Sequence, residues 1–246
     1  MLQEDAILVL KTGEALSEVR AHCGDFEDWI ARGLGRATEE VAVAAVYEGD
    51  PLPPTESIRA VIVTGSPAMV TARADWSEVS ARWLARIVEG DMIPVLGLCY
   101  GHQLIAHGLG GEVGSNPRGR EMGTVDVVLP EHGIDADPLF ETGVFPGHMS
   151  HVESVLIAPR DARVIGTTAI EEHAVLQFGP RQWGVQFHPE FDREIMRRYV
   201  EARREILIGE GFDPDALIDA AVETPVLTRI LERFAGMVDR GPADPV

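Results

Sequence analysis

The short stretch "GLCYGHQ", residues 97–103, places one cysteine between two glycines after an apolar run. A nucleophile on a sharp turn between a strand and a helix needs small neighbours two positions away on either side, because the backbone is crowded there. The N–H groups and the dipole of the following helix favour a thiolate and a developing oxyanion at the same point. Cys99 is therefore a candidate nucleophile, although a buried thiol beside two turn glycines would give this same stretch.

A histidine and a glutamate follow a second apolar run in "GVQFHPEF", residues 184–191. Cysteine–histidine chemistry needs an imidazole that exchanges protons with the thiol and the leaving group, and a third group that orients the ring. Residues i and i+2 of an extended segment project to the same side, so Glu190 can approach His188. Together with the turn around Cys99, this pair favours a Cys99–His188–Glu190 triad over three separate structural residues.

The N-terminal part of the chain alternates between short apolar runs and helical periodicity. Continuous apolar runs predict buried strands at residues 6–10, 41–46, 60–65 and 93–98. Helical patterns cover residues 26–35 and 74–90, and a further helix follows Cys99. This alternation predicts a three-layer α/β domain with a mainly parallel sheet. Such sheets bind ligands at the carboxyl ends of their strands, where Cys99 would lie.

The second half of the chain differs in character. Apolar runs at residues 124–129, 152–158, 173–179 and 182–188 are spaced like strands of a more antiparallel or mixed sheet. Helical patterns follow at residues 192–208, 213–221 and 224–238, with Thr224 as the expected N-cap of the last. We expect one domain over residues 1–208 and a C-terminal helical extension over residues 209–246 packed on it, with docking on a partner or a second subunit as the alternative.

The composition excludes several classes of function. The 246 residues include 40 Asp and Glu against 21 Lys and Arg, a net charge of −19 that opposes binding to nucleic acids and anionic membranes. No apolar stretch approaches the ~18 residues that span a bilayer, and the N-terminus lacks the basic region of a signal peptide. Two cysteines, Cys23 and Cys99, make no disulfide framework. We therefore expect a cytoplasmic protein with a free thiol.

Neither a metal nor another cofactor is expected. The chain has eight histidines, but no cysteine or carboxylate cluster completes a ligand set with the usual spacing. The glycine-rich stretch at residues 107–121 lacks the known phosphate-binding patterns and is expected to be a loop. Its Arg118, Arg120 and Glu121 could line the mouth of a pocket near Cys99.

Four stretches together resemble the class I glutamine amidotransferases, and most of all the glutaminase domain of GMP synthase. "GLCYGHQLIAHGLGG" and "GVQFHPE" are similar to the two signature stretches of that family. "VTGSPAMV" (63–70) is similar to its oxyanion loop, and "MSHVESV" (149–155) to its "MSHGD" segment. The resemblance implies a three-layer α/β/α flavodoxin-like (Rossmann-like) fold and a glutaminase that releases ammonia from the γ-amide of glutamine through a γ-glutamyl thioester.

Carried over position by position, the resemblance also implies a role for each matching residue. Cys99 would be the nucleophile, His188 the general base and acid, and Glu190 its orienting partner. The oxyanion would be held by the backbone N–H of Tyr100 and by one from the Gly65–Ser66 turn. The residues that match the substrate-binding positions are Gln103, Ser150, His151, Val152 and Glu153.

Two departures from the family pattern keep other functions open. Val152 and Glu153 stand where the family has glycine and aspartate, and the oxyanion turn has one glycine before Pro67 instead of two. One alternative is a γ-glutamyl peptidase or hydrolase that acts on a γ-glutamyl conjugate, and a second is a non-catalytic regulatory module of the same fold. The expected ligand is a small molecule, the expected partner is a separately encoded synthase that consumes ammonia, and a homodimer is a further option.

Overall fold

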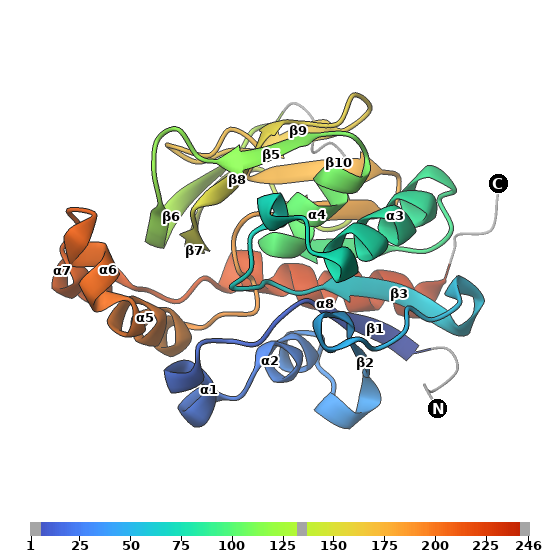
Figure 1. Ribbon diagram of the computed structural model, residues 1–246, viewed down its shortest axis with the longest axis horizontal. Coiled ribbons are helices and arrows are strands. Elements are labelled where there is room, and N and C mark those ends of the chain that lie inside the picture. The colour runs from blue at the N-terminus through green and yellow to red at the C-terminus, as the bar shows by residue number, and fades with distance from the viewer. Residues whose placement is uncertain (1–5, 132–136, 242–246) are drawn as a thin grey trace.

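The computed structural model describes residues 6–131 and 137–241 (Figure 1). The strands are β1 (Ala6–Lys11), β2 (Ala42–Ala45), β3 (Ile58–Val63), β4 (Val95–Leu98), β5 (Glu112–Ser115), β6 (Glu121–Leu129), β7 (Gly143–His151), β8 (Glu153–Ile157), β9 (Arg163–Gly166), β10 (Val175–Gly179) and β11 (Gln182–Val185). The α-helices are α1 (Ser17–Cys23), α2 (Phe26–Gly33), α3 (Asp75–Glu89), α4 (Tyr100–Gly108), α5 (Arg193–Ala202), α6 (Arg204–Gly209), α7 (Pro214–Ala220) and α8 (Pro225–Arg240).

In the described residues, a central sheet of seven strands has the order β2-β1-β3-β4-β11-β10-β9. The first five strands in that order run parallel to one another. At the other edge, β10 is antiparallel to both β11 and β9. The prediction of a mainly parallel sheet is therefore confirmed, and β4 lies between β3 and β11.

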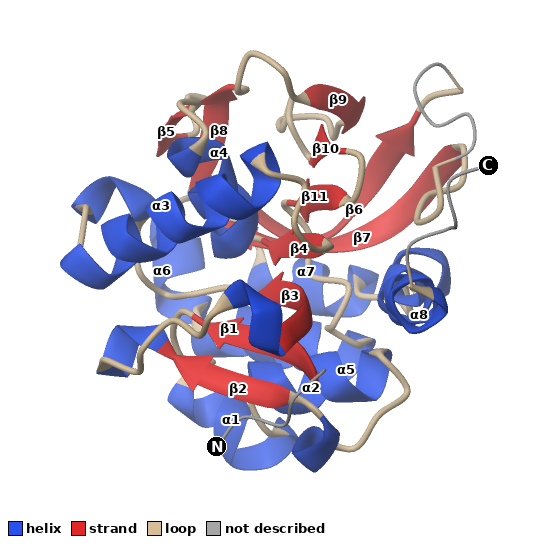
Figure 2. Cartoon of the chain, turned by 90° about the vertical axis from the view of Figure 1, so that its right-hand side faces the viewer, coloured by secondary structure: helices blue, strands red, loops and turns tan. Residues whose placement is uncertain are grey.

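The strands of the sheet are apolar on both faces because helices cover both sides. Ile7 and Val9 of β1 belong to one core cluster, and the alternate residues Leu8 and Leu10 belong to the other. The first cluster contains Ile30 and Ala31 of α2 and the buried face of α8, and the second contains the buried faces of α3 and α4. Figure 2 shows α3 and α4 on one side of the strands and α8 on the opposite side. The three-layer flavodoxin-like architecture is confirmed.

The second half of the chain departs from the predicted strands in two ways. The predicted runs at 124–129 and 152–158 lie in β6 and β8, but these form separate two-stranded ribbons, β6 with β7 and β5 with β8. The run at 182–188 is a strand only as far as Val185, so the prediction is wrong for its last three residues. Because β11 is parallel to β4, the segment that follows it lies beside the segment that follows β4.

The C-terminal helices pack on the rest of the chain. The predicted helix at 192–208 is broken at Arg203 into α5 and α6. In α8, the face that carries Leu231 and Phe234 is buried in the same core cluster as β1. Thr224 precedes α8 as expected, but its side chain makes no capping hydrogen bond to the backbone of the helix. Its hydroxyl instead lies 3.3 Å from the hydroxyl of Thr228. The boundary after residue 208 stays a prediction. No helix in the described residues is long and apolar enough to cross a membrane.

Candidate active site

Cys99 lies directly after β4 in a backbone conformation that is rare for its residue type. Its φ of +48° and ψ of −100° are unusual for any residue with a Cβ, and such conformations cluster at functional sites. Two hydrogen bonds hold it there: its N–H donates to the carbonyl of Val185 at 2.8 Å, and its carbonyl accepts from the N–H of Gln103 at 3.1 Å. The cysteine is thus fixed at the point where β4 gives way to α4.

The glycines on either side of Cys99 are required by close backbone contacts. A Cβ on Gly101 would lie 2.5 Å from the carbonyl oxygen of Val63 in β3. A Cβ on Gly97 would lie 2.6 Å from the backbone of Gly101. Both distances are shorter than real contacts allow, so the sharp turn that presents Cys99 depends on glycine at these two positions.

Three neighbouring strands bring together segments that are distant in the sequence. The Gly65–Ser66 turn follows β3, Cys99 follows β4, and His188 follows β11. These strands are adjacent and parallel, so their carboxyl ends meet at one edge of the sheet. This edge is where sheets of this architecture bind ligands.

His188 and Glu190 form a buried pair. The Nδ1 atom of His188 lies 2.7 Å from Oε1 of Glu190, whose side chain is fully buried. The imidazole ring stacks on Phe191 with 4.1 Å between the ring centroids, and Phe26 lies parallel to it at 6.4 Å. The backbone N–H of His188 donates to the carbonyl of His148 at 2.9 Å. The ring is therefore fixed in orientation and shielded from water.

The surroundings of His188 favour its protonated form. Burial lowers the pKa of His188, but the charge of the Glu190 carboxylate and the interactions with the Cys99 side chain outweigh it and raise the pKa to about 10. The shift favours an imidazolium, which would face Cys99. An imidazolium in this position stabilises a thiolate and can donate a proton to a leaving amine.

The Gly65–Ser66 turn closes the other side of Cys99. A Cβ on Gly65 would lie 2.9 Å from Cε1 of His188, so the ring occupies the space that a side chain would need. The Ser66 hydroxyl donates to the carbonyl of Thr12 at 2.7 Å, which fixes the turn. In the described residues, neither the N–H of Ser66 nor that of Tyr100 donates to a backbone carbonyl. Both residues line one cavity with Cys99.

All five predicted substrate-binding residues line this cavity: Gln103, Ser150, His151, Val152 and Glu153. The Gln103 amide nitrogen donates to the carbonyl of Glu153 at 2.6 Å and to Oε1 of Gln186 at 2.9 Å. Its amide protons are therefore committed to the protein, and Gln103 shapes the wall of the cavity. Ser150 differs, because its buried hydroxyl has no hydrogen-bond partner in the described residues.

His151 and Glu153 are also held by protein contacts. The ring of His151 lies 2.9 Å from the carbonyl of Glu153 and 3.1 Å from Oε2 of Glu121. The Glu153 carboxylate accepts a short hydrogen bond from the hydroxyl of Thr71. The segment around Val152 is therefore anchored on both sides of the cavity.

Val152 causes no backbone strain at the position where the family has glycine. Val152 is absent from the residues with positive φ in the described chain, so its backbone conformation is open to any residue. Its carbonyl accepts from the N–H of Asn116 at 2.8 Å. The substitution therefore changes the cavity wall through its side chain and leaves the backbone of this segment unstrained.

The three polar residues expected at the pocket mouth separate in the structure. Arg120 lines the cavity. Glu121 is buried behind the cavity, where it contacts His151 and accepts from the Thr168 hydroxyl at 2.6 Å. Arg118 pairs with Glu172 at 2.6 Å and does not line the cavity.

Two residues of the site were not predicted from the sequence. Gln186 is fully buried, and its amide nitrogen lies 3.5 Å from Sγ of Cys99. The only signal for it was a polar residue inside an apolar run, "GVQFH". Arg203 lines the cavity from the break between α5 and α6, where the helical pattern gave no indication of a site. In the described residues, no group of three or more metal-ligating side chains is arranged to hold a metal.

Comparisons with known proteins find related sequences. The sequence profile of the family described as glutamine amidotransferase class-I matches residues 22–203. A glutamine amidotransferase-like protein of Gibberella zeae is 29% identical over 177 residues, which cover 71% of this chain and 71% of that protein. The glutamine-hydrolyzing GMP synthase of Aeropyrum pernix is 35% identical over 147 residues, which cover 60% of this chain but 26% of that enzyme.

The same architecture occurs in solved structures. The crystal structure of a glutamine amidotransferase from Thermotoga maritima matches with a TM-score of 0.74 at 22% sequence identity. The match covers 95% of this chain and 97% of that one. At this level of identity, the similarity shows that the two chains share a fold.

Proposed function

The chain belongs to the class I glutamine amidotransferases, and from this premise we propose that it hydrolyses a γ-glutamyl amide with Cys99 as the nucleophile. One observation carries the proposal: a cysteine in a strained turn faces a buried, charged His188–Glu190 pair at the ends of adjoining strands. A structural thiol would need neither the strain nor the imidazolium.

In the first step, the Cys99 thiolate attacks the γ-carbonyl carbon of the substrate. The carbonyl oxygen becomes an oxyanion and accepts hydrogen bonds from the backbone N–H groups of Ser66 and Tyr100, which have no backbone acceptor among the described residues. Each such donor typically contributes about 3 kcal/mol to stabilising the transition state. The helix that begins at Tyr100 adds its positive end to the same stabilisation.

In the second step, His188 donates its proton to the leaving nitrogen while the carbon–nitrogen bond breaks. A γ-glutamyl thioester on Cys99 remains, and the amine or ammonia departs. The neutral His188 then takes a proton from water, which attacks the thioester and releases glutamate and the thiolate. Glu190 stabilises the imidazolium at both ends of this cycle through its 2.7 Å contact.

Free glutamine is the proposed substrate, because relatives of this chain are named as glutamine-hydrolyzing enzymes. The second candidate is a γ-glutamyl conjugate. The valine at position 152 favours it, since this departure from the family pattern changes the cavity wall without disturbing the triad. A non-catalytic module would not account for the strained cysteine and the charged pair.

The remaining parts of the proposal concern the setting of the enzyme. Residues 1–208 would form the amidotransferase domain and residues 209–246 its helical extension, in a cytoplasmic protein. Ammonia would pass to a separately encoded synthase. A homodimer is the alternative assembly.

The experiment that tests the proposal compares two cysteine variants. The purified chain is assayed for release of ammonia or amine from glutamine and from a panel of γ-glutamyl compounds. Cys99→Ala is expected to abolish release, whereas Cys23→Ala should retain it because Cys23 lies outside the cavity. A glutamine-mimicking chloroketone should form its adduct on Cys99. Activity that persists in Cys99→Ala would show that the triad assignment is wrong.

A further inference from the structure

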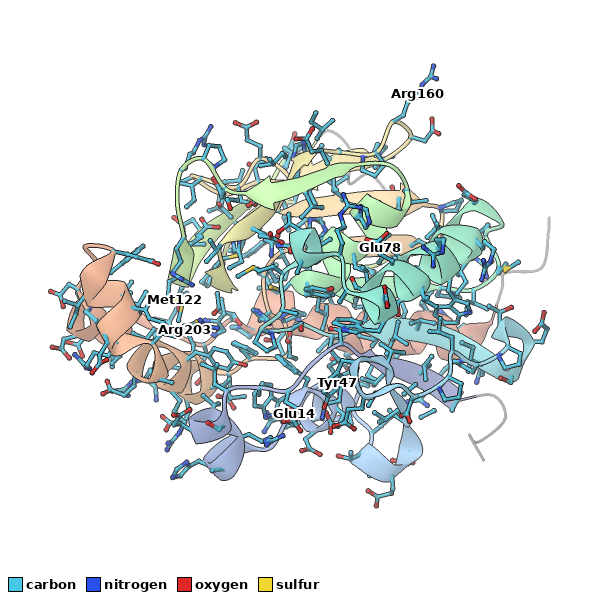
Figure 3. All side chains as sticks on the ribbon, in the orientation of Figure 1. Glu14, Tyr47, Glu78, Met122, Arg160 and Arg203 are labelled. Carbon is cyan, nitrogen blue, oxygen red and sulfur yellow. The ribbon has the colours of Figure 1, made fainter. Side chains whose placement is uncertain are left out.

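One half-buried cation that lines the cavity with Cys99 has a guanidinium nitrogen without a hydrogen-bond partner in the described residues. Arg203 lines the cavity from the junction of α5 and α6. Figure 3 labels Arg203 at the place where these helices meet the rest of the molecule. Its Nε atom is buried and, within residues 6–131 and 137–241, finds no hydrogen-bond partner. The adjacent Arg204 provides a contrast, because it lies outside the cavity and pairs with Glu201 at 2.6 Å and Asp215 at 2.7 Å.

A second arginine lies on the same wall. Arg120 lines the cavity, and its guanidinium is held by both carboxylate oxygens of Glu210, at 2.7 and 3.0 Å. Both oxygens of Glu210 are therefore bonded to Arg120, and Glu210 acts on Arg203 through its charge. Burial, and then the charge of Arg120, lower the pKa of Arg203. The one carboxylate among the residues that line this cavity, Glu153, already accepts a hydrogen bond from the Thr71 hydroxyl.

Further polar groups of the cavity converge on the same place. The buried hydroxyl of Ser150 has no partner in the described part of the chain, and Ser150 and Arg203 both line the cavity beside Cys99. The same three residues also line the adjoining hollow that contains His188. Arg203 is therefore placed between the side that holds Gln103 and the side from which His188 would protonate the leaving group.

We propose that Arg203, supported by Arg120, is the carboxylate-binding residue of a substrate subsite beside Cys99. An arginine guanidinium presents a planar set of donors that matches a carboxylate, and a carboxylate ligand would supply the partner that the buried Nε of Arg203 lacks in the described residues. The ligand class, a γ-glutamyl compound, rests on the proposed function. The bound carboxylate is either the α-carboxylate of the γ-glutamyl half or a carboxylate on the leaving amine.

Binding measured without catalysis tests the subsite. Cys99→Ala and the double variant Cys99→Ala/Arg203→Met are titrated calorimetrically with four probes. γ-Glutamylglycine carries both carboxylates, γ-glutamylethylamide only the α-carboxylate, γ-aminobutyrylglycine only the one on the leaving amine, and γ-aminobutyramide neither. The Arg203→Met change should weaken γ-glutamylglycine about 10- to 150-fold, the usual range for a hydrogen bond to a charged group, and leave γ-aminobutyramide unaffected. Loss for one of the two singly charged probes then identifies the carboxylate.

Two further variants keep the test specific. Arg204→Met removes the same charge one residue away and should change binding by no more than about twofold, as for an exposed ion pair. Arg203→Lys keeps the charge without the planar fork and should retain part of the affinity. Equal weakening of all four probes, no weakening of any, or no binding of any probe to Cys99→Ala would overturn the subsite. Binding with the expected selectivity but no hydrolysis by the unmodified chain would overturn the proposed function alone.

Discussion

Glu190→Gln isolates the contribution of one negative charge to the proposed mechanism. Glutamine has the size of glutamate and can still accept a hydrogen bond from Nδ1 of His188, where the carboxylate oxygen now lies 2.7 Å away. The Glu190 side chain is fully buried, so water cannot replace the lost charge. The substitution therefore changes the electrostatics of the pair and leaves its packing almost unaltered.

The expected magnitude follows from the change in one hydrogen bond. A bond to a charged group contributes about 1.5–3 kcal/mol and one between neutral groups about 0.5–1.5 kcal/mol, so the loss is about 1–2 kcal/mol. That corresponds to a fall of about one unit in the pKa of His188, which the structure raises to about 10. It also corresponds to a loss of about 5- to 30-fold in kcat/KM.

The sign of the pH effect is fixed by the raised pKa of His188. The active ion pair needs His188 protonated, so activity should fall as the pH rises toward 10, and Glu190→Gln should move this alkaline limb to lower pH. Protonation of His188 also stabilises the folded state. This stabilisation is fully present below the ordinary histidine pKa of 6.5 and is lost as the pH rises through the folded-state pKa of His188, about 10. The difference in unfolding free energy between the two proteins should therefore shrink between pH 7 and 10.

The assay is the pH profile of kcat/KM with the best γ-glutamyl substrate. The matched control is Glu78→Gln, which removes the carboxylate 2.9 Å from His107 in a histidine–glutamate pair that does not line the cavity. The control should retain the alkaline limb of the unmodified chain. An unshifted limb in Glu190→Gln, or a loss of rate with the same limb, would refute the assignment of the imidazolium to catalysis.

Three further substitutions test other parts of the structure. Gly101→Ala places a Cβ 2.5 Å from the Val63 carbonyl and should cost about 1–3 kcal/mol of unfolding free energy and abolish activity; a variant of full stability and rate would contradict the turn geometry. Gln186→Leu should lower stability by about 1–3 kcal/mol, because the buried Gln103 amide loses a partner, and should reduce kcat/KM; an unchanged rate would remove Gln186 from the site. Phe234→Ala should cost about 3–5 kcal/mol in denaturant unfolding, since α8 belongs to the main core, and a cost under 1 kcal/mol would argue against that packing.

The strands that could be predicted are those buried on both faces. In β1, β3 and β4 almost every residue is apolar, and this pattern is visible without any tertiary information. The strands that were not predicted, β5, β7 and β9, have polar, glycine or exposed positions, and β7 even contains Pro146. They pair in ribbons or at the sheet edge, where burial on both faces is not required. Their existence depends on partners that the local sequence does not reveal.

The site divides in a similar way. The turn around Cys99 and the His188–Glu190 spacing are local patterns, and their chemistry could be inferred from a few neighbouring residues. Gln186 and Arg203 act through contacts with segments far away in the sequence. Gln186 reaches Cys99 across two adjacent strands, and Arg203 reaches the cavity because the helical segment breaks there. The break itself was not visible in the periodicity of residues 192–208.

The raised pKa of His188 changes the order of proton transfers in the proposed mechanism. A neutral imidazole would first take the thiol proton, whereas an imidazolium at rest has its proton ready for the leaving amine. His188 and Arg203 then line the same hollow as Cys99, in a strongly acidic chain. In the proposed mechanism, the charge that stabilises the thiolate also attracts a carboxylate substrate toward it. Substrate selection and activation of the nucleophile would then rest on the same local electrostatic field, and the Arg203 variants separate the two because they are compared in a chain without the thiol.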